Sequence, residues 1–161
     1  MSKAYQVVGI GNAVSDVIAT SSDEFLIENG VEKGIMQLVD QPRAEALFSA
    51  MGSRTETPGG SVANTIAGLG SLGLRTAFIG RVADDDLGHS YALAMQTQGT
   101  DFPNPPVPNA GLPTSRSMIF VSPDGERSMN TYLGISSDLG PEDVSDEVIR
   151  DCEILFLGVS L

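Results

Sequence analysis

The chain has 161 residues, the length of about one domain, and carries 21 acidic against 9 basic side chains, for a net charge of -12. This charge argues against nucleic acid or an anionic membrane surface as a partner. The single cysteine, Cys152, excludes an internal disulfide, and the single histidine, His89, cannot complete a zinc site with it. No apolar run approaches membrane-spanning length, so we expect a soluble protein of the cytoplasm.

Apolar runs of strand length alternate with helical patterns, and this alternation predicts a layered α/β domain. Strands are predicted at residues 5–11, 16–20, 34–40, 75–80, 117–121, 126–133 and 153–159. Helices are predicted at residues 22–28, 42–52, 61–73, 86–98 and 142–150. Residues 100–114 contain five prolines and little periodicity, which predicts an extended connector.

The predicted strands fall into two sets. Apolar strands such as 75–80 and 153–159 are typical of a buried parallel sheet. Strands 117–121 and 126–133 are more polar and flank the turn sequence Ser122-Pro123-Asp124-Gly125, which predicts a hairpin. We interpret this hairpin as part of a small flap over a cleft.

Residues 57–60, Thr-Pro-Gly-Gly, lead directly into a helical pattern. The proline and the paired glycines predict a turn and exclude both helix and strand. Gly59 and Gly60 permit positive φ and close approach of the backbone to a ligand, and the helix start offers free N–H groups. Asn64 lies in the first turn of this helix. The alternative is a plain loop with Ser61 as a good cap on a core helix.

Gly9 and Gly11 end the first predicted strand in a pattern that superficially indicates a dinucleotide-binding turn. Val14 replaces the third glycine of that pattern and extended sequence follows, so a nicotinamide-dependent oxidoreductase is disfavoured. Asn12 and Asp16 follow the carboxyl end of a strand, where open α/β sheets bind ligands. A carboxylate there is able to accept two hydrogen bonds from a diol, although a loop-capping pair is the alternative.

The acidic triplet at residues 84–86, His89 and Arg127 are further candidates for a functional role, and each also has a purely structural explanation. The triplet Asp84-Asp85-Asp86 favours helix capping over metal binding, because consecutive carboxylates rarely converge on one ion. We interpret His89, one turn later, as structural or exposed. Arg127 is either solvated, as lone arginines on strands usually are, or placed on the flap to neutralise a phosphate.

Four motifs occur in order along the chain. They are Gly-x-Gly-Asn-x-x-x-Asp ending at Asp16, Gly59-Gly60-Ser61-x-x-Asn64, Gly80-Arg81-Val82-x-Asp84-Asp85-x-x-Gly88, and Pro123-Asp124-Gly125-Glu126-Arg127-Ser128-Met129. Together they resemble the ribokinase-like (phosphofructokinase B) family of sugar and nucleoside kinases over nearly the whole chain. The spacing from Asn12 to Asp16 is more similar to adenosine kinase than to ribokinase, and Val62 departs from the small residue common in the glycine motif.

The resemblance implies a Rossmann-like parallel sheet with helices on both faces and a small β-sheet lid, with lid strands within residues 16–20, 34–40, 117–121 and 126–133. It also implies that the hydroxyls of a nucleoside or sugar are bound by Asn12, Asp16, Gly59, Gly60, Ser61 and Asn64. Arg127 resembles the flap arginine that contacts the transferring phosphate in adenosine kinases. The complete family enzyme is expected to use Mg²⁺ and ATP.

Family members are about twice as long as this chain. Their Gly-Ala-Gly-Asp turn, which carries the catalytic base, does not occur in the sequence. The magnesium-associated Asn-x-x-Glu and the nucleotide pocket belong to the same missing half, so we assign no catalytic or metal residue. Residues 1–161 are therefore interpreted as the N-terminal part of a single kinase domain, inactive alone. A nucleoside- or sugar-binding fragment and a non-functional remnant are the alternatives.

The chain ends Leu157-Gly158-Val159-Ser160-Leu161, where similar family members typically continue Leu-Glu-Gly-Tyr-Leu. A frameshift with premature termination is one hypothesis for this ending, and resequencing of the gene tests it. A parallel sheet that stops at residues 154–158 leaves a hydrophobic edge, which predicts self-association through that edge or through the lid.

Overall fold

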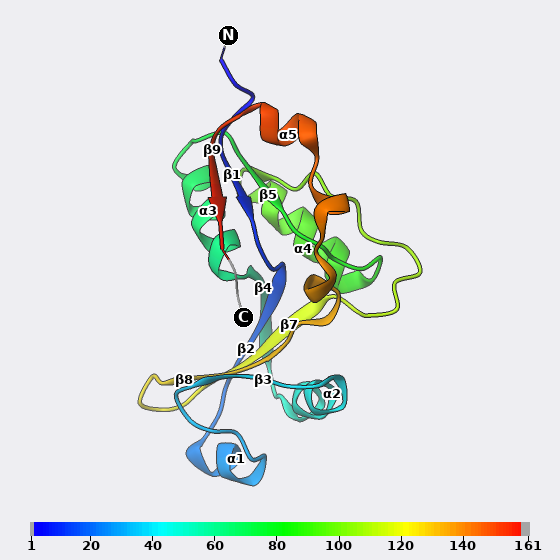
Figure 1. Cartoon of the computed structure of the whole chain (residues 1–161). Helices are drawn as coiled ribbons and strands as arrows, with labels where there is room; N and C mark the ends of the chain where they lie inside the picture. The colour runs from blue at the N-terminus through cyan, green and yellow to red at the C-terminus, as the bar shows by residue number, and fades with distance from the viewer. Residues whose placement is uncertain (1, 159–161) are drawn as a thin grey trace.

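The computed structural model describes residues 2–158, which form two β-sheets (Figure 1). One sheet is parallel throughout, with the strand order β6-β5-β1-β9. Its strands are β1 (Tyr5–Ile10), β5 (Thr76–Ile79), β6 (Thr100–Asp101) and β9 (Cys152–Leu157). This is the layered α/β architecture that the alternating sequence predicts.

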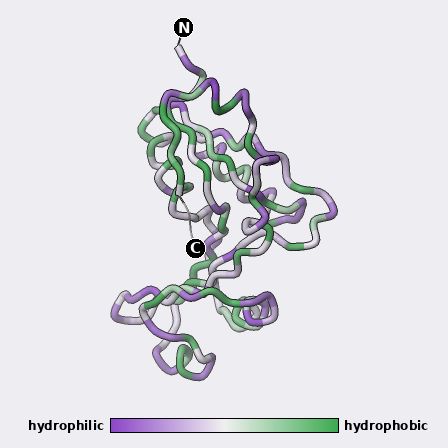
Figure 2. The backbone as a smooth tube through the Cα atoms, viewed as in Figure 1, coloured by the Kyte–Doolittle hydropathy of each residue, from purple (hydrophilic) through white to green (hydrophobic). Residues whose placement is uncertain are grey.

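Helices cover both faces of the parallel sheet. On one face, α3 (Ser61–Ser71) and α4 (Asp86–Thr97) pack against Val7 and Phe78 in one buried cluster. On the other face lies α5 (Asp146–Arg150). Its residues Val148 and Ile149 pack against a second buried cluster, which consists of Val8, Ala77 and Ile79. In Figure 2 the hydrophobic colour runs through this sheet, β9 included.

The second sheet has five strands in the order β3-β8-β7-β2-β4. They are β2 (Val14–Thr20), β3 (Met36–Leu38), β4 (Arg54–Gly59), β7 (Ser115–Val121) and β8 (Arg127–Tyr132). The predicted hairpin is confirmed, because β7 and β8 pair antiparallel. Two helices, α1 (Asp23–Glu28) and α2 (Gln41–Ala50), cover one face of this sheet (Figure 1). The opposite face is left for the cavity described below.

Helix caps follow the local chemistry of the sequence. Ser22 accepts a hydrogen bond from the Phe25 N–H, and Asp40 accepts one from the Arg43 N–H. Asp85 caps α4 through the Gly88 N–H at 2.7 Å and also binds the Thr114 hydroxyl. The capping interpretation of the acidic triplet is therefore confirmed. His89 is exposed, with its Nε2 2.6 Å from Asp84 Oδ1.

The expectation that residues 57–60 exclude a strand is wrong. Pro58 and Gly59 belong to β4, which pairs antiparallel with β2. This strand lies at the edge of its sheet, where a proline without an N–H costs no ladder hydrogen bond. The glycine pair is therefore split between the end of a strand and the start of a helix.

Several predicted boundaries also change. The helix expected at residues 142–150 is divided into η2 (Pro141–Asp143) and α5, because Ser145 caps a new helix at the Val148 N–H. The strand expected at 34–40 shortens to β3, and the connector at 100–114 contributes the two-residue strand β6. A five-residue 3₁₀ helix, η1 (Gly134–Asp138), follows β8. Within residues 2–158 no helix combines the length and apolar character needed to cross a membrane.

The strand predicted to close the sheet forms as β9, but the prediction that it is buried is wrong. Ile154, Leu155, Phe156 and Leu157 are 58, 40, 41 and 63% exposed. The cause is its position, since β9 pairs with β1 on one side and with no other described strand on the other. The predicted last residue, Val159, and the rest of the atypical chain ending lie outside the described residues.

Candidate functional site

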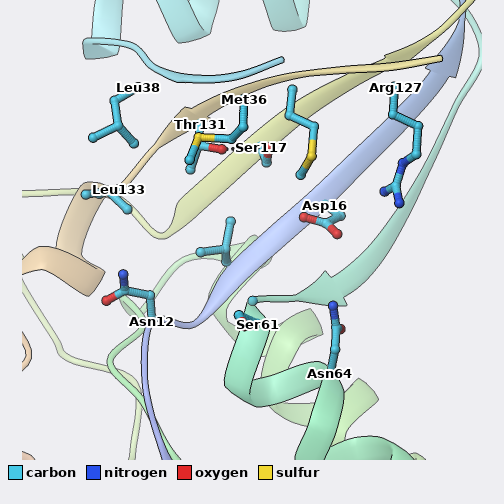
Figure 3. Close-up of a pocket in the computed structure, with 13 residues that line it drawn as sticks. Asn12, Asp16, Met36, Leu38, Ser61, Asn64, Ser117, Arg127, Thr131 and Leu133 are labelled. Atoms are coloured by element: carbon cyan, nitrogen blue, oxygen red, sulfur yellow. Dashed lines mark hydrogen bonds between the residues drawn. The ribbon is translucent and has the colours of Figure 1, made fainter. Parts of the chain in front are cut away.

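A cavity of about 300 Å³ lies between the open face of the five-stranded sheet and the start of α3 (Figure 3). Strand β2 leads into it directly from β1, and α3 begins where the edge strand β4 ends. Its lining residues are Asn12, Val14, Asp16, Met36, Leu38, Gly60, Ser61, Asn64, Ser117, Arg127, Met129, Thr131 and Leu133.

The structure brings six of the seven residues singled out in the sequence to this one cavity. They are Asn12, Asp16, Gly60, Ser61, Asn64 and Arg127. In Figure 3, Arg127 points from the sheet toward Asp16, and Asn64 points from α3 toward the same carboxylate. Residues that are up to 115 positions apart in the sequence, from Asn12 to Arg127, therefore share one site.

Gly59 is the seventh residue, and it does not line the cavity. It is buried behind Asp16, and a Cβ built on it would lie 2.4 Å from the Asp16 Cγ. Only a residue without a side chain allows the carboxylate to lie this close to the strand backbone. The contribution of Gly59 to the site is thus the room it leaves for Asp16.

Gly60 is the N-cap of α3 and has a φ of 106°, a conformation that favours glycine. A Cβ at this position would lie 2.4 Å from the Asn12 carbonyl oxygen. The expectation that Ser61 caps the helix is wrong, because Ser61 is the first helical residue and no side chain caps α3. Ser61 instead lines the cavity, one turn before Asn64, whose N–H donates to the Gly60 carbonyl at 2.8 Å.

Asp16 is half-buried, and this burial raises the pKa of its carboxyl group to about 6, although nearby Arg127 acts to lower it. Arg127 itself is exposed and forms no ion pair within residues 2–158. At neutral pH the cavity therefore holds a carboxylate and an unpaired guanidinium on one side. This pair is suited to a ligand with hydroxyl donors and an anionic group.

The opposite side of the cavity is apolar. Met36 and Leu38 of β3, Met129 of β8, and Leu133 just after β8 form this wall. Met36 and Leu38 are 53 and 51% exposed, so the wall is open to a ligand. The sequence predicted lid strands within residues 34–40 and 126–133 but singled out none of these four side chains. Alternation along the predicted hairpin is the signal that would have found Met129.

Two buried hydroxyls form the floor between these sides. Ser117 and Thr131 are opposite each other on β7 and β8, and their side-chain oxygens are 2.8 Å apart. Both were missed in the sequence because small polar residues on strands carry no distinctive signal. Their hydrogen bond links β7 and β8 at the floor of the cavity.

A second cavity of about 430 Å³ lies at the carboxyl ends of β1 and β9. It shares Asn12 and Leu133 with the first cavity, and Ser136 and Ser137 of η1 add hydroxyl groups. Carboxyl ends of parallel strands are the usual ligand-binding edge of open α/β sheets. The two cavities thus form adjoining parts of one cleft with Asn12 at their junction.

No cluster of three or more His, Cys, Asp or Glu side chains suited to a metal occurs in the part of the chain that the structure describes. Asp16 is the single carboxylate that lines the first cavity.

Comparison with known proteins gives a consistent family. The sequence model of the pfkB family carbohydrate kinases matches residues 35–158. The crystal structure of adenosine kinase from Sinorhizobium meliloti has a TM-score of 0.87 and 50% identity, covering 96% of this chain and 47% of that chain. A probable sugar kinase from Rhizobium etli has a TM-score of 0.87 and 44% identity, with the same coverage of 96% and 47%.

A plant sequence gives the same pattern of coverage. Probable fructokinase-2 of Arabidopsis thaliana is 30% identical over 144 residues, which are 81% of this chain and 42% of that protein. The chain thus spans less than half the length of these relatives.

Proposed function

Because the chain belongs to the pfkB family of carbohydrate kinases, we propose that it carries the acceptor-binding half of an ATP-dependent kinase. The acceptor is a hydroxyl group of a nucleoside or sugar. The observation that supports this most strongly is the convergence of Asn12, Asp16, Asn64 and Arg127 on one cavity beside the Gly60 turn. Such a site holds hydroxyl groups and an anionic group close together.

Each side chain has a role that follows from its chemistry. The Asp16 carboxylate accepts hydrogen bonds from two ligand hydroxyls, and the amides of Asn12 and Asn64 both donate and accept. The guanidinium of Arg127 offers a positively charged, planar set of donors to a phosphate. These residues orient the acceptor, and positioning is the main protein contribution to phosphoryl transfer.

Mg²⁺ and ATP would supply the transferred phosphoryl group and the counter-charge on it. Because residues 2–158 hold no cluster of metal-ligating side chains, we assign no residue of this chain to Mg²⁺. The same holds for the catalytic base, which we place in the half of the family domain that this chain does not span. We also propose the cytoplasm as the compartment, in keeping with one unpaired cysteine.

The apolar wall favours a nucleoside over a free sugar as the acceptor. A free hexose exposes hydroxyls around its whole ring and leaves the methionine and leucine side chains without an apolar partner. A nucleobase offers a flat, weakly polar face to Met36 and Met129 while its ribose reaches Asp16. The 50% identity to an adenosine kinase supports this order of preference.

Calorimetric titration of the 161-residue chain with adenosine, ribose and fructose, paired with an ATP-turnover assay, tests the proposal. We expect saturable binding that is tightest for adenosine, and no turnover. Binding without turnover supports the fragment that retains acceptor affinity. Turnover by this chain alone contradicts the assignment of the catalytic machinery to another segment, and no binding of any acceptor supports a non-functional remnant.

A further inference from the structure

Gly59 is held by side chains from two different elements. The hydroxyl of Tyr91, in α4, donates a hydrogen bond to the Gly59 carbonyl oxygen at 2.9 Å. The Asp16 carboxylate lies against the same residue, in the space that a Cβ would occupy. Asp16 lines the cavity, whereas Tyr91 does not. A buried side chain outside the cavity thus contacts the backbone on which the cavity carboxylate lies.

Tyr91 is fixed firmly enough to act as an anchor. It is 2% exposed, belongs to the cluster that α3 and α4 form on the parallel sheet, and contacts the Phe102 ring edge-on with centroids 5.7 Å apart. Burial, and then the charge of Asp16, raise the pKa of its hydroxyl group, so the hydroxyl stays protonated and remains a donor. The Tyr91 hydroxyl therefore keeps the proton that it donates to the Gly59 carbonyl oxygen.

We propose that Tyr91 is a positioning residue of the acceptor site, acting through the Gly59–Gly60 peptide. The C=O of Gly59 and the N–H of Gly60 belong to one planar trans peptide. A hydrogen bond that fixes the Gly59 carbonyl group therefore also fixes the direction of the Gly60 N–H. In this way it fixes the start of α3 at Gly60. The same bond joins the core of the parallel sheet to the edge strand β4 of the other sheet.

The inference rests on the proposed function of the cavity, and Tyr91→Phe tests it with the smallest change. Phenylalanine keeps the ring packing and loses only the hydroxyl. We expect adenosine affinity to weaken by about three- to tenfold, the usual effect of one lost hydrogen bond. The matched control is Tyr5→Phe, which removes the Tyr5 hydroxyl bond to Asp101 at the opposite end of β1. This control should leave affinity unchanged.

Two readouts separate positioning from a merely structural role. The double variant Asp16→Asn, Tyr91→Phe should show a non-additive loss of affinity, because Tyr91 acts through the backbone that supports Asp16. In the ligand-free protein, Tyr91→Phe should lower the NMR order parameters of the Gly59 and Gly60 amides, while Tyr5→Phe leaves them unchanged.

Unchanged order parameters at residues 59 and 60, or an affinity loss that adds independently to that of Asp16→Asn, would overturn the positioning role. If the wild-type chain binds no adenosine, ribose or fructose, the proposed function fails. In that case the order parameters still show whether Tyr91 fixes the Gly59–Gly60 peptide, because they require no ligand.

Discussion

The cavity and the β9 edge are two open surfaces of this molecule, and they differ in what surrounds them. The cavity is backed by a sheet whose other face is covered by α1 and α2, and most of its polar side chains lie on strands or on α3. At β9, four consecutive apolar side chains are exposed beside a parallel sheet that is otherwise covered. The first surface is suited to a small ligand, and the second to another strand and helices.

This difference indicates that the proposed acceptor recognition and the completion of the sheet are separable in the chain. The lining of the cavity comes entirely from residues between Asn12 and Leu133, far from β9 in the sequence. Covering β9 requires polypeptide that residues 2–158 do not provide. We propose that the remaining half of the family domain supplies it, and that self-association replaces it when this chain is alone.

The largest effect is expected at the turn that forms the cavity. Gly60→Ala places a Cβ 2.4 Å from the Asn12 carbonyl at a φ of 106°. The strain and overlap should lower the free energy of unfolding by about 2–4 kcal/mol and abolish acceptor binding. Urea denaturation and calorimetric titration measure the two effects. Gly111→Ala is the matched control, since a Cβ there meets nothing within 4 Å; equal losses in both variants would refute the steric argument.

Asp16→Asn tests the cavity without disturbing the fold. Replacing the carboxylate weakens its hydrogen bonds to ligand hydroxyls, so affinity for adenosine should fall about 10- to 100-fold. Stability at neutral pH should stay the same or rise, because a half-buried charge is removed. Asp146→Asn on the exposed surface of α5 serves as the control. An affinity unaffected by Asp16→Asn would exclude this cavity as the acceptor site.

The β9 surface is tested by Leu157→Lys. Lysine on an edge strand opposes strand addition, so the dissociation constant for self-association should rise at least about tenfold, or ~1.4 kcal/mol. Sedimentation velocity over a range of concentrations measures it. The control is Leu72→Lys. Leu72 is 79% exposed at the C-cap of α3, so this variant should leave the dissociation constant for self-association unchanged. A wild-type chain that is a monodisperse monomer with a cooperative melt would contradict the association.

The sequence predicted the parts of the site that follow from strand ends and turns. Asn12 and Asp16 were found because they follow a buried strand, and Arg127 because it follows a hairpin turn. The edge strand β4 was missed because proline and glycine are usually absent from strands, and only its place at the edge permits them. The Tyr91 bond to Gly59 joins residues 32 positions apart in sequence, and no local pattern reveals such a contact.

The pH dependence of stability gives the smallest effect and the finest test of Asp16. Its pKa is about 6 in the folded protein against the ordinary aspartate value of 3.8, so the unfolded chain loses this proton first as pH rises. The contribution of Asp16 to stability therefore falls between about pH 4 and pH 6 and stays low above that. The full shift corresponds to at most about 3 kcal/mol, and partial exposure reduces it to the order of 1 kcal/mol.

Urea denaturation of the wild type and Asp16→Asn from pH 4 to pH 7 measures this contribution. The variant should gain stability relative to the wild type as pH rises through this window. Asp124→Asn is the control. The hydrogen bond from Lys33 lowers the pKa of Asp124, so the contribution of Asp124 to stability changes only below about pH 4, and this variant should follow the wild-type profile from pH 4 to pH 7. If Asp16→Asn follows the wild-type profile as well, then Asp16 is fully solvated. The cavity would then lack the desolvated carboxylate on which hydroxyl recognition depends.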